Sequence, residues 1–458
     1  MGVSGAQAAA HGKNTNSGET RPGLAARRAA QRLLAAVIET RTSLDGLTDD
    51  EHGHPQFMAL EPRDRALVRA ILATALRHRV TIDRLLAALF DRPLPKNATN
   101  LLHILHVAAA QILFLDIPDH SAVDLAVESA KADPRNARFA SLVNAVLRKL
   151  IRSKATALPQ MLAAMDDAPD WLVERLRSAY GTDKAHAILA AHRRPAPLDL
   201  TVKADAAGWA EQLNGIVLPN GTVRLESFEG KVSALPGFAE GAWWVQDVAA
   251  SLPARLMGDI KGKRVADLCA APGGKTASLI LQGAIVTAVD MSASRLKRLE
   301  GNLSRLGLSA ETRIANLLDF KPAEPLGAVL LDAPCSSTGT IRRHPDVAWT
   351  KTPEDIEKLA ALQFRLLVHC ISLVKPGGVI LFSNCSLDPL EGEALAARFL
   401  AEQAGVGRYA FEPRELPGFA HLIDAQGFLR TTPADLDLGR PEISGMDGFF
   451  AARFKRLN

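Results

Sequence analysis

The stretch that decides the fold of the C-terminal half reads Ala266-Asp267-Leu268-Cys269-Ala270-Ala271-Pro272-Gly273-Gly274-Lys275-Thr276. An apolar run at residues 265–268 predicts a short strand, and the small residues after it predict a turn into a helix. A ligand can approach a backbone that carries no bulky side chains, and the first helical turn offers free N–H groups. This Gly-rich loop (residues 269–275) is therefore a predicted ligand site.

Two kinds of ligand fit the Gly-rich loop. Residues 274–276 resemble the end of a phosphate-binding P-loop, and residues 329–332 resemble the acidic strand that serves its magnesium ion. The first glycine of a P-loop falls on Cys269, however, which breaks the phosphate cradle. An adenosine-type ligand instead requires an acidic residue after the next strand for its ribose hydroxyl groups, and Asp290 occurs there. We favour the adenosine-type ligand; a turn that needs small residues only for packing is the third possibility.

Strand and helix patterns alternate after the Gly-rich loop. Further strands are predicted by apolar runs at residues 284–289, 328–331 and 379–383. This order predicts an α/β fold for residues 256–458, a Rossmann-like, doubly wound parallel sheet with ligands at the carboxyl ends of its strands.

The rest of the chain divides into three predicted parts. Residues 1–23 are polar and contain no apolar signal-peptide core, which predicts a disordered tail on a cytoplasmic protein. Residues 24–155 carry apolar side chains at helical spacing in about five segments, which predicts a compact all-α bundle. Residues 156–255 mix helical stretches with short strand-like pieces and predict a small α+β subdomain.

The composition excludes several classes of protein. With 47% hydrophobic and 23% charged residues, the chain of 458 residues has the make-up of a soluble folded protein. No apolar run reaches the roughly 18–20 residues that span a bilayer, so we expect no membrane association. The 4 cysteines are widely spaced, which argues against a disulfide scaffold or a zinc cluster and indicates a reducing compartment.

Positive charge is concentrated in the N-terminal part. Residues 1–155 contain 21 basic and 15 acidic residues, whereas the net charge of the whole chain is +4. Such an excess favours an anionic partner such as nucleic acid, with an ordinary solvated surface as the alternative. The candidate phosphate contacts are Arg28, Arg63, Arg65, Arg342 and Arg343.

Two cysteines follow the ends of predicted strands. Cys335 lies in the run Asp-Ala-Pro-Cys-Ser that begins at Asp332, and Cys385 lies in the run Ser-Asn-Cys-Ser that begins at Ser383. Their polar loops favour reactive thiols, whereas Cys370 lies in an apolar helix and is expected to be inert. Because no histidine is close in sequence, we expect no metal site.

These motifs together resemble those of the Sun family, RNA 5-methylcytosine methyltransferases that use S-adenosylmethionine. The resemblance rests on Asp-Leu-Cys-Ala-Ala-Pro-Gly-Gly-Lys-Thr from Asp267, Asp-Ala-Pro-Cys-Ser-Ser-Thr-Gly from Asp332, and Asn-Cys-Ser from Asn384. Residues 24–151 resemble the NusB-type helical RNA-binding domain. The pairing points to the group within the family that acts on bacterial small-subunit (16S) ribosomal RNA.

The resemblance implies a role for each site residue. Cys385 would be the thiolate that adds to carbon 6 of cytosine and so makes carbon 5 nucleophilic. Asp332 would protonate or hydrogen-bond ring nitrogen 3 and lie by the amino end of the cofactor, and Cys335 would help to resolve the adduct. The remaining predicted contacts to S-adenosylmethionine are Cys269, Ala270, Ala271, Pro272, Gly273, Gly274, Lys275, Asp290 and Asn316.

Two positions depart from the family pattern. Asn316 stands where an acidic residue usually faces the adenine, and Asn384 stands where threonine is common. Asparagine can still form a hydrogen bond, so we expect activity to survive.

The target base has to leave its stack to reach the thiols. We expect a monomer. The alternatives to an RNA methyltransferase are a noncatalytic RNA-binding scaffold, a P-loop nucleotidase and a DNA methyltransferase.

Overall fold

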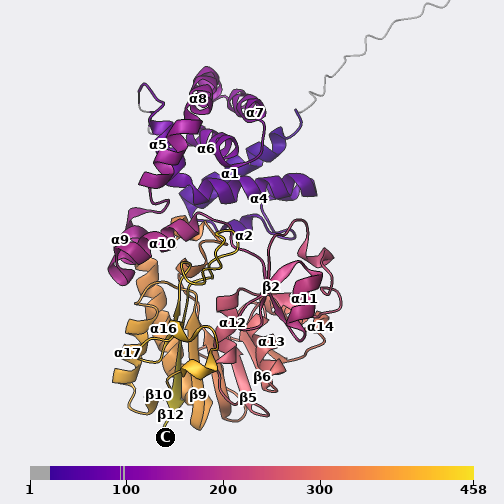
Figure 1. Ribbon diagram of the computed structural model, residues 1–458, viewed down its shortest axis with the longest axis vertical. Helices are drawn as coiled ribbons and strands as arrows, with labels where there is room; N and C mark the ends of the chain where they lie inside the picture. The colour runs from indigo at the N-terminus through magenta and orange to yellow at the C-terminus, as the bar shows by residue number, and fades with distance from the viewer. Residues whose placement is uncertain (1–20, 93, 96–97) are drawn as a thin grey trace, which may run out of the picture.

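The computed structural model describes residues 21–92, 94–95 and 98–458; of the predicted disordered tail, residues 1–20 lie outside the described residues. An all-α bundle forms the N-terminal part, as predicted (Figure 1). Its helices are α1 (Leu24–Thr40), α2 (Leu44–Leu47), α3 (Pro55–Met58), α4 (Pro62–Arg77), α5 (Arg79–Ala87), α6 (Thr99–Phe114), α7 (Asp119–Ala132) and α8 (Ala140–Ala164).

Helix ends in the bundle follow local chemistry. Helix α4 begins at Pro62, because proline lacks the N–H that the first helical turn leaves unpaired. The backbone leaves helical geometry at His78, which separates α4 from α5 within one continuous apolar pattern. Helix α8 runs on to Ala164, although its buried side chains end at Leu150. Its last turns pack only partly buried apolar side chains, among them Leu158 and Met161, against the bundle core.

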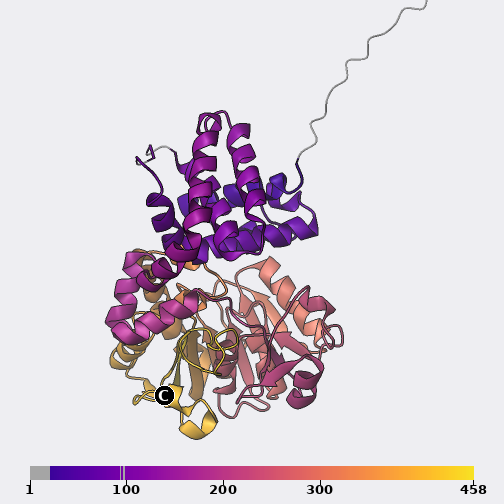
Figure 2. The same ribbon diagram turned by 45° about the horizontal axis from the view of Figure 1, so that its top comes forward.

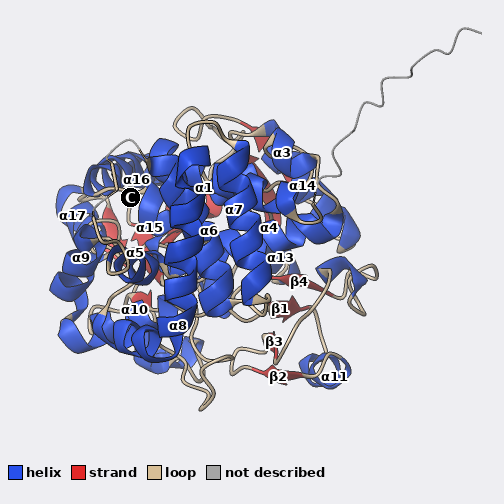
Figure 3. Cartoon of the chain, turned by 90° about the horizontal axis from the view of Figure 1, so that it is seen from above, coloured by secondary structure: helices blue, strands red, loops and turns tan. Residues whose placement is uncertain are grey.

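The middle of the chain is α+β, which confirms the predicted class. Helices α9 (Asp170–Tyr180) and α10 (Thr182–His192) precede a small antiparallel sheet in the order β2-β3-β1-β4, accompanied by α11 (Ala206–Gln212) (Figure 3). Its strands are β1 (Asp199–Val202), β2 (Gly215–Val217), β3 (Val223–Leu225) and β4 (Trp243–Val245).

The C-terminal part is built on a Rossmann-like sheet. Within the described residues it has eight strands in the order β10-β12-β9-β8-β5-β6-β7, with β11 paired to β12. The strands are β5 (Arg264–Leu268), β6 (Ile285–Asp290), β7 (Glu311–Ile314), β8 (Leu326–Asp332), β9 (Val374–Asn384), β10 (Val406–Arg408), β11 (Leu429–Thr431) and β12 (Phe449–Arg456). The helices are α12 (Val248–Arg255), α13 (Gly274–Leu281), α14 (Ala293–Arg305), α15 (Val347–Thr350), α16 (Pro353–Leu373) and α17 (Glu393–Glu402).

The four predicted strands, which are β5, β6, β8 and β9, pair in parallel as expected, but the strands nearest the C-terminus add an antiparallel part to the sheet. Strands β5 to β9 pair in parallel, but β12 pairs antiparallel with β9, β10 and β11. An apolar run shows that a strand is buried and does not show the direction of its neighbour. The pattern also missed β7, because this edge strand is largely exposed and carries no apolar alternation.

The helical bundle rests on the C-terminal domain (Figure 2). The indole Nε1–H of Trp349 donates to the carbonyl oxygen of Leu76 (3.0 Å), and Arg77 donates to the carbonyl oxygen of Arg342 (3.1 Å). The backbone N–H of Leu44 donates to the carboxylate of Asp346 (3.0 Å). The bundle thus contacts the segment that follows Cys335. In the described ranges, no helix has the length and apolar character needed to cross a membrane.

Candidate active site

The two predicted reactive cysteines lie side by side because β8 and β9 are parallel neighbours. Asp332 at the end of β8 is in register with Ser383 on β9, and the N–H of Ala333 donates to the carbonyl oxygen of Ser383 (2.8 Å). The loops that follow both strands therefore leave the sheet together. The sulfur atoms of Cys335 and Cys385 lie 3.4 Å apart as a result.

The two thiols are electrostatically unequal. The hydrogen bond between them lowers the pKa of Cys385 and raises the pKa of Cys335, since it stabilises the thiolate of Cys385. Burial raises the pKa of Cys269 and of Cys370, and Cys370 is fully buried in the core, as predicted. Within this pair of thiols, the contact favours the thiolate on Cys385.

Buried polar groups fix the loops that carry the thiols. The carboxylate of Glu391 accepts hydrogen bonds from the N–H (2.9 Å) and hydroxyl (2.5 Å) of Ser336, next to Cys335. Asn384 donates its side-chain amide to the carbonyl oxygen of Glu391 (2.6 Å) and accepts the N–H of Ser386 (3.0 Å). The unusual asparagine thus shapes the turn at Cys385. Sequence reasoning had not assigned Glu391 a role, although it lies just after the Asn-Cys-Ser motif.

Lys275 and Asp332 form an ion pair beside the cysteines. The ammonium group of Lys275 lies 2.8 Å from Oδ2 of Asp332, whose Oδ1 accepts the hydroxyl of Ser383 (2.8 Å). The ammonium group also lies 4.9 Å from the ring centroid of Phe449. The pair therefore joins the Gly-rich loop to the end of β8.

This ion pair lines a cavity of about 430 Å³. Its walls come from the Gly-rich loop, from β4 and the start of α12, and from the segments around Arg343 and Phe449. The residues that line the cavity include Asp247, Asp267, Lys275, Asp332, Arg343 and Phe449. Among the described residues that line the cavity, Asp290, Asn316, Cys335 and Cys385 do not appear.

The backbone of the Gly-rich loop explains its small residues. Gly273 has a φ of 105°, and a Cβ added there would lie 3.0 Å from Cγ of Leu299. Asp267, fully buried at the end of β5, accepts the hydroxyl of Thr276 on α13 (2.6 Å). Burial raises the pKa of Asp267 to about 7. Together these contacts hold the first turn of α13 against the strand end.

The predicted adenosine contacts occupy the neighbouring strand ends. Asp290 ends β6; its carboxylate accepts the N–H of Ala271 (3.4 Å) from the Gly-rich loop. Asn316 lies just beyond β7 and is exposed. The apolar side chains of Met291 and Ile314 lie beside Asp290 and Asn316 in the chain. They are 66% and 65% exposed, so they are not packed in the core. Sequence reasoning missed both residues. Met291 directly follows the acidic end of β6, which is an available signal, whereas Ile314 is the last residue of the exposed edge strand β7 and offers none.

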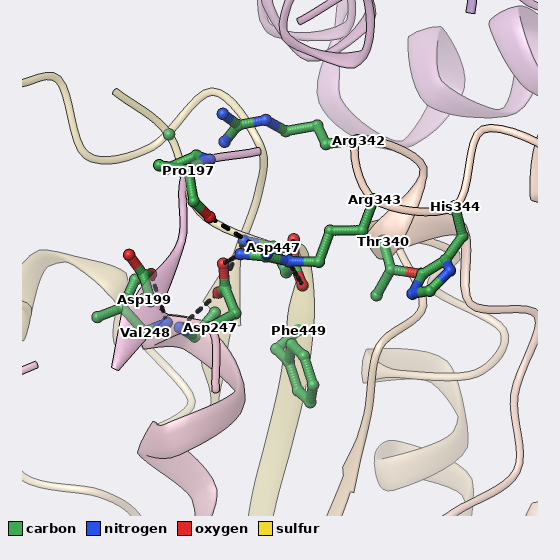
Figure 4. A network of polar contacts seen from close by, with 12 residues as sticks. Pro197, Asp199, Asp247, Val248, Thr340, Arg342, Arg343, His344, Asp447 and Phe449 are labelled. Atoms are coloured by element: carbon green, nitrogen blue, oxygen red, sulfur yellow. Dashed lines mark hydrogen bonds and ion pairs between the residues drawn. The ribbon is translucent and has the colours of Figure 1, made fainter. Parts of the chain in front are cut away.

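The predicted RNA-binding arginines differ in their surroundings. Arg28 on α1 and Arg63 on α4 are exposed, whereas Arg65 donates to the carbonyl oxygens of Leu60 (2.9 Å) and Met58 (2.6 Å). Arg342 is 2% exposed and donates to the carbonyl oxygen of Ser444 (3.0 Å). The guanidinium group of Arg343 is held by two carboxylates (Figure 4). Arg342 and Arg343 therefore have internal partners in this conformation.

We find no candidate metal centre in the described part of the chain. No group of three or more His, Cys, Asp or Glu side chains is arranged there to hold a metal ion.

Solved structures share this architecture. The crystal structure of PH0851 aligns with a TM-score of 0.71 and 21% sequence identity, covering 95% of this chain and 99% of that one. The crystal structure of NSun6 from Pyrococcus horikoshii with SFG aligns with a TM-score of 0.53 and 17% identity, covering 63% of this chain and 98% of that one. These likenesses show the class of fold that the chain adopts.

Sequence relatives narrow this class to a family. Residues 256–455 match the family described as 16S rRNA methyltransferase RsmB/F, and residues 24–152 match the NusB family. Ribosomal RNA small subunit methyltransferase B of Xanthomonas campestris is 38% identical over 83% of this chain and 89% of its own length. The protein of the same name from Salmonella arizonae is 34% identical over 87% of this chain and 95% of its own length. The chain belongs to this family of methyltransferases.

Proposed function

We propose that the protein methylates carbon 5 of a cytosine in small-subunit (16S) ribosomal RNA through a covalent adduct with Cys385. One observation carries the proposal: the Cys385 thiol, with its lowered pKa, lies 3.4 Å from a second thiol and just past the strand pair that carries Asp332. The names of the relatives support ribosomal RNA as the substrate.

Carbon 5 of cytosine has to be made nucleophilic before it can be methylated. The Cys385 thiolate adds to carbon 6, and the ring becomes an enamine whose carbon 5 can attack an electrophile. Asp332 hydrogen-bonds ring nitrogen 3, and the ammonium group of Lys275, 2.8 Å from that carboxylate, supplies the proton that the nitrogen takes up. When bound, S-adenosylmethionine supplies an electrophilic methyl group.

The adduct then has to be resolved. Water, acting as the base, takes the carbon-5 proton, and the bond between carbon 6 and the sulfur of Cys385 breaks with its electron pair returning to the sulfur. Ring nitrogen 3 returns its proton to the amine of Lys275, which restores the aromatic ring, the ammonium group and the free thiolate. We assign Cys335 to this elimination because its sulfur is in contact with the sulfur that leaves.

The residues at the strand ends fit the cofactor. Asp290 would take the ribose hydroxyl groups, Asn316 would hydrogen-bond the adenine, and the exposed side chains of Met291 and Ile314 offer apolar contact to its ring. The Gly-rich loop would hold the methionine part. Because Asn316 is uncharged, its side chain would recognise the adenine by hydrogen bonding and not by charge.

The helical bundle would hold the RNA. Arg28 and Arg63 offer exposed positive charge on packed helices, and the match to the NusB family covers both. One chain supplies both this face and the cavity, so a monomer suffices. A ribosomal RNA substrate places the enzyme in the cytoplasm.

A mechanism-based substrate tests the nucleophile. RNA that contains 5-fluorocytosine should form a stable adduct with the wild type, because fluorine cannot leave carbon 5 as a proton does. Cys385→Ala should lose the adduct in a denaturing gel, while Cys370→Ala, which changes a core thiol, should keep it. If Cys385→Ala methylates ordinary RNA at the wild-type rate, the assignment of the nucleophile is wrong.

Ordinary RNA tests the second thiol. Cys335→Ala should accumulate a covalent complex with unmodified RNA, since addition and methyl transfer proceed while elimination slows. Release of methylated RNA at the wild-type rate would remove Cys335 from the mechanism.

A further inference from the structure

A short segment after Cys335, residues 338–343, contacts both Cys385 and the cavity, since Gly339 hydrogen-bonds to Cys385 and Thr340 and Arg343 line the cavity. The N–H of Gly339 donates to the carbonyl oxygen of Cys385 (2.9 Å), and the N–H of Gly448 donates to the carbonyl oxygen of Gly339 (2.8 Å). A Cβ added at Gly339 would lie 2.0 Å from the carbonyl oxygen of Gly448, so the two backbones touch. The position of Cys385 is therefore tied to the turn that leads into β12.

Arg343 anchors the far end of this segment. Its Nε lies 3.0 Å from Oδ2 of Asp447, its Nη2 lies 2.5 Å from Oδ2 of Asp247, and its Nη1 donates to the carbonyl oxygen of Pro197 (3.2 Å) (Figure 4). One planar guanidinium group thus joins the segment before β1, the start of α12 and the turn before β12. Only arginine presents donors in several fixed directions for such a junction.

The carboxylate of Asp247 also holds two backbone N–H groups in place. Oδ1 of Asp247 accepts the N–H of Ala249 (2.8 Å), which caps α12, and the N–H of Asp447 (3.0 Å). Asp247 and Asp447 are 6% and 3% exposed. Without the guanidinium group, these two buried carboxylates would lose the cation to which both are directly bonded.

The junction also controls Phe449, two residues after Asp447. The hydroxyl of Thr431 donates to the carbonyl oxygen of Asp447 (2.7 Å), and the N–H of Phe449 donates to that hydroxyl oxygen (2.7 Å). The ring of Phe449 in turn lies 4.9 Å from the ammonium group of Lys275. A shift of Asp447 would therefore displace the ring that contacts Lys275.

We propose that Arg343 is a positioning residue for methyl transfer and not a contact to the RNA backbone. It acts through two neighbours, the Gly339 backbone that holds Cys385 and the Asp447 turn that holds Phe449 beside Lys275. The part that concerns Cys385 rests on the proposed function. Displacing a reacting group by about 1 Å can cost two orders of magnitude in rate.

Conservative and disruptive variants separate the possible roles. Arg343→Lys keeps the charge but loses the fixed fork, and should lower kcat about 10-fold with the KM for RNA within about 2-fold of wild type. Arg343→Met should lower kcat about 100-fold. The rate at which iodoacetamide alkylates Cys385 at pH 7.5, mapped by mass spectrometry, should be lower in Arg343→Lys than in the wild type and lowest in Arg343→Met. Because the methionine variant has the harsher effect on folding, the lysine variant alone can decide the test.

The matched control is Arg453→Lys. Arg453 lies on β12 and is also an internal arginine paired with a carboxylate, that of Glu415 (2.7 Å); its side chain is 1% exposed, against 22% for Arg343. It contacts neither the cavity nor the cysteine loops. It should lower the melting temperature without changing kcat or the alkylation rate. A raised KM for RNA with unchanged kcat in Arg343→Lys would overturn the proposal in favour of a phosphate contact. A lowered melting temperature with unchanged kcat and alkylation would overturn it in favour of a purely structural role. Failure of the proposed nucleophile would appear separately, as activity of Cys385→Ala.

Discussion

The thiol of Cys335 lies within hydrogen-bond reach of the thiol of Cys385, 3.4 Å away across a sequence separation of 50 residues. The contact follows from the parallel pairing of β8 with β9, which ends both strands at the same edge. A shared proton between two sulfur atoms favours a thiolate on one of them. The second cysteine therefore has an effect on the first before any RNA binds.

Removing Cys335 should make Cys385 harder to ionise. In Cys335→Ala the hydrogen bond that lowers the pKa of Cys385 is absent, so the pH profile of its alkylation should shift to higher pH. The rate of iodoacetamide labelling at Cys385, measured between pH 6 and pH 10 without RNA, checks this. Cys370→Ala should leave the profile in place, and a profile that stays unchanged in Cys335→Ala would show that the sulfur contact has no electrostatic effect.

Lys275 should be needed for turnover more than for folding. Lys275→Met removes the ammonium group 2.8 Å from Asp332, and with it the proposed source of the proton for ring nitrogen 3. We expect kcat to fall about 100-fold, a typical loss for one preorganised donor, with a cooperative thermal transition retained. Lys297→Met, an exposed change on α14, is the control and should retain full activity. A kcat within about 2-fold of wild type in Lys275→Met would refute the role, because removing one donor normally costs far more.

Asp267 should make the stability of the protein depend on pH. Its pKa is raised by burial to about 7, above the ordinary value of an aspartate, so the folded state favours the protonated carboxyl group. The associated stability is fully present below the unfolded pKa and is lost as the pH rises towards 7. Asp267→Asn should lack this loss, and its free energy of unfolding relative to wild type should rise by about 1–3 kcal/mol between pH 5 and pH 8.

Urea unfolding at both pH values measures this difference. Asp259→Asn, an exposed change before β5, should follow the wild type at both values. If the relative stability of Asp267→Asn is the same at pH 5 and pH 8, the Asp267 carboxyl group does not titrate in this range.

The placement of the strand ends could be predicted from the sequence, whereas their polar partners could not. Apolar runs end at Asp290 and Asp332, and parallel strands bring such ends to one edge. The ion pair of Lys275 with Asp332 was missed because it links the start of α13 to the end of β8, 57 residues apart in sequence, and no local pattern encodes which partner a lysine takes.

Contacts between residues far apart in sequence account for the other features that the sequence did not predict. Arg343 lies in a polar, basic run that favours an RNA contact by composition alone. Its carboxylate partners are 96 and 104 residues away in sequence, and only the folded chain brings them together. Strand direction at β12 is another long-range property, since its register with β9 decides it.

Charge reversal on the bundle should weaken RNA binding without changing the chemistry. Arg28 and Arg63 are exposed on α1 and α4, so Arg28→Glu with Arg63→Glu removes two positive charges from the surface of the proposed RNA-binding bundle. The slope of log Kd against log salt concentration should fall by about 1 for each arginine that no longer neutralises a phosphate. Saturating RNA should restore kcat, because the cavity is untouched. Lys261→Glu, before β5 at the amino-end edge of the sheet, should leave the slope unchanged. An unchanged slope in the double variant would place the RNA on another face.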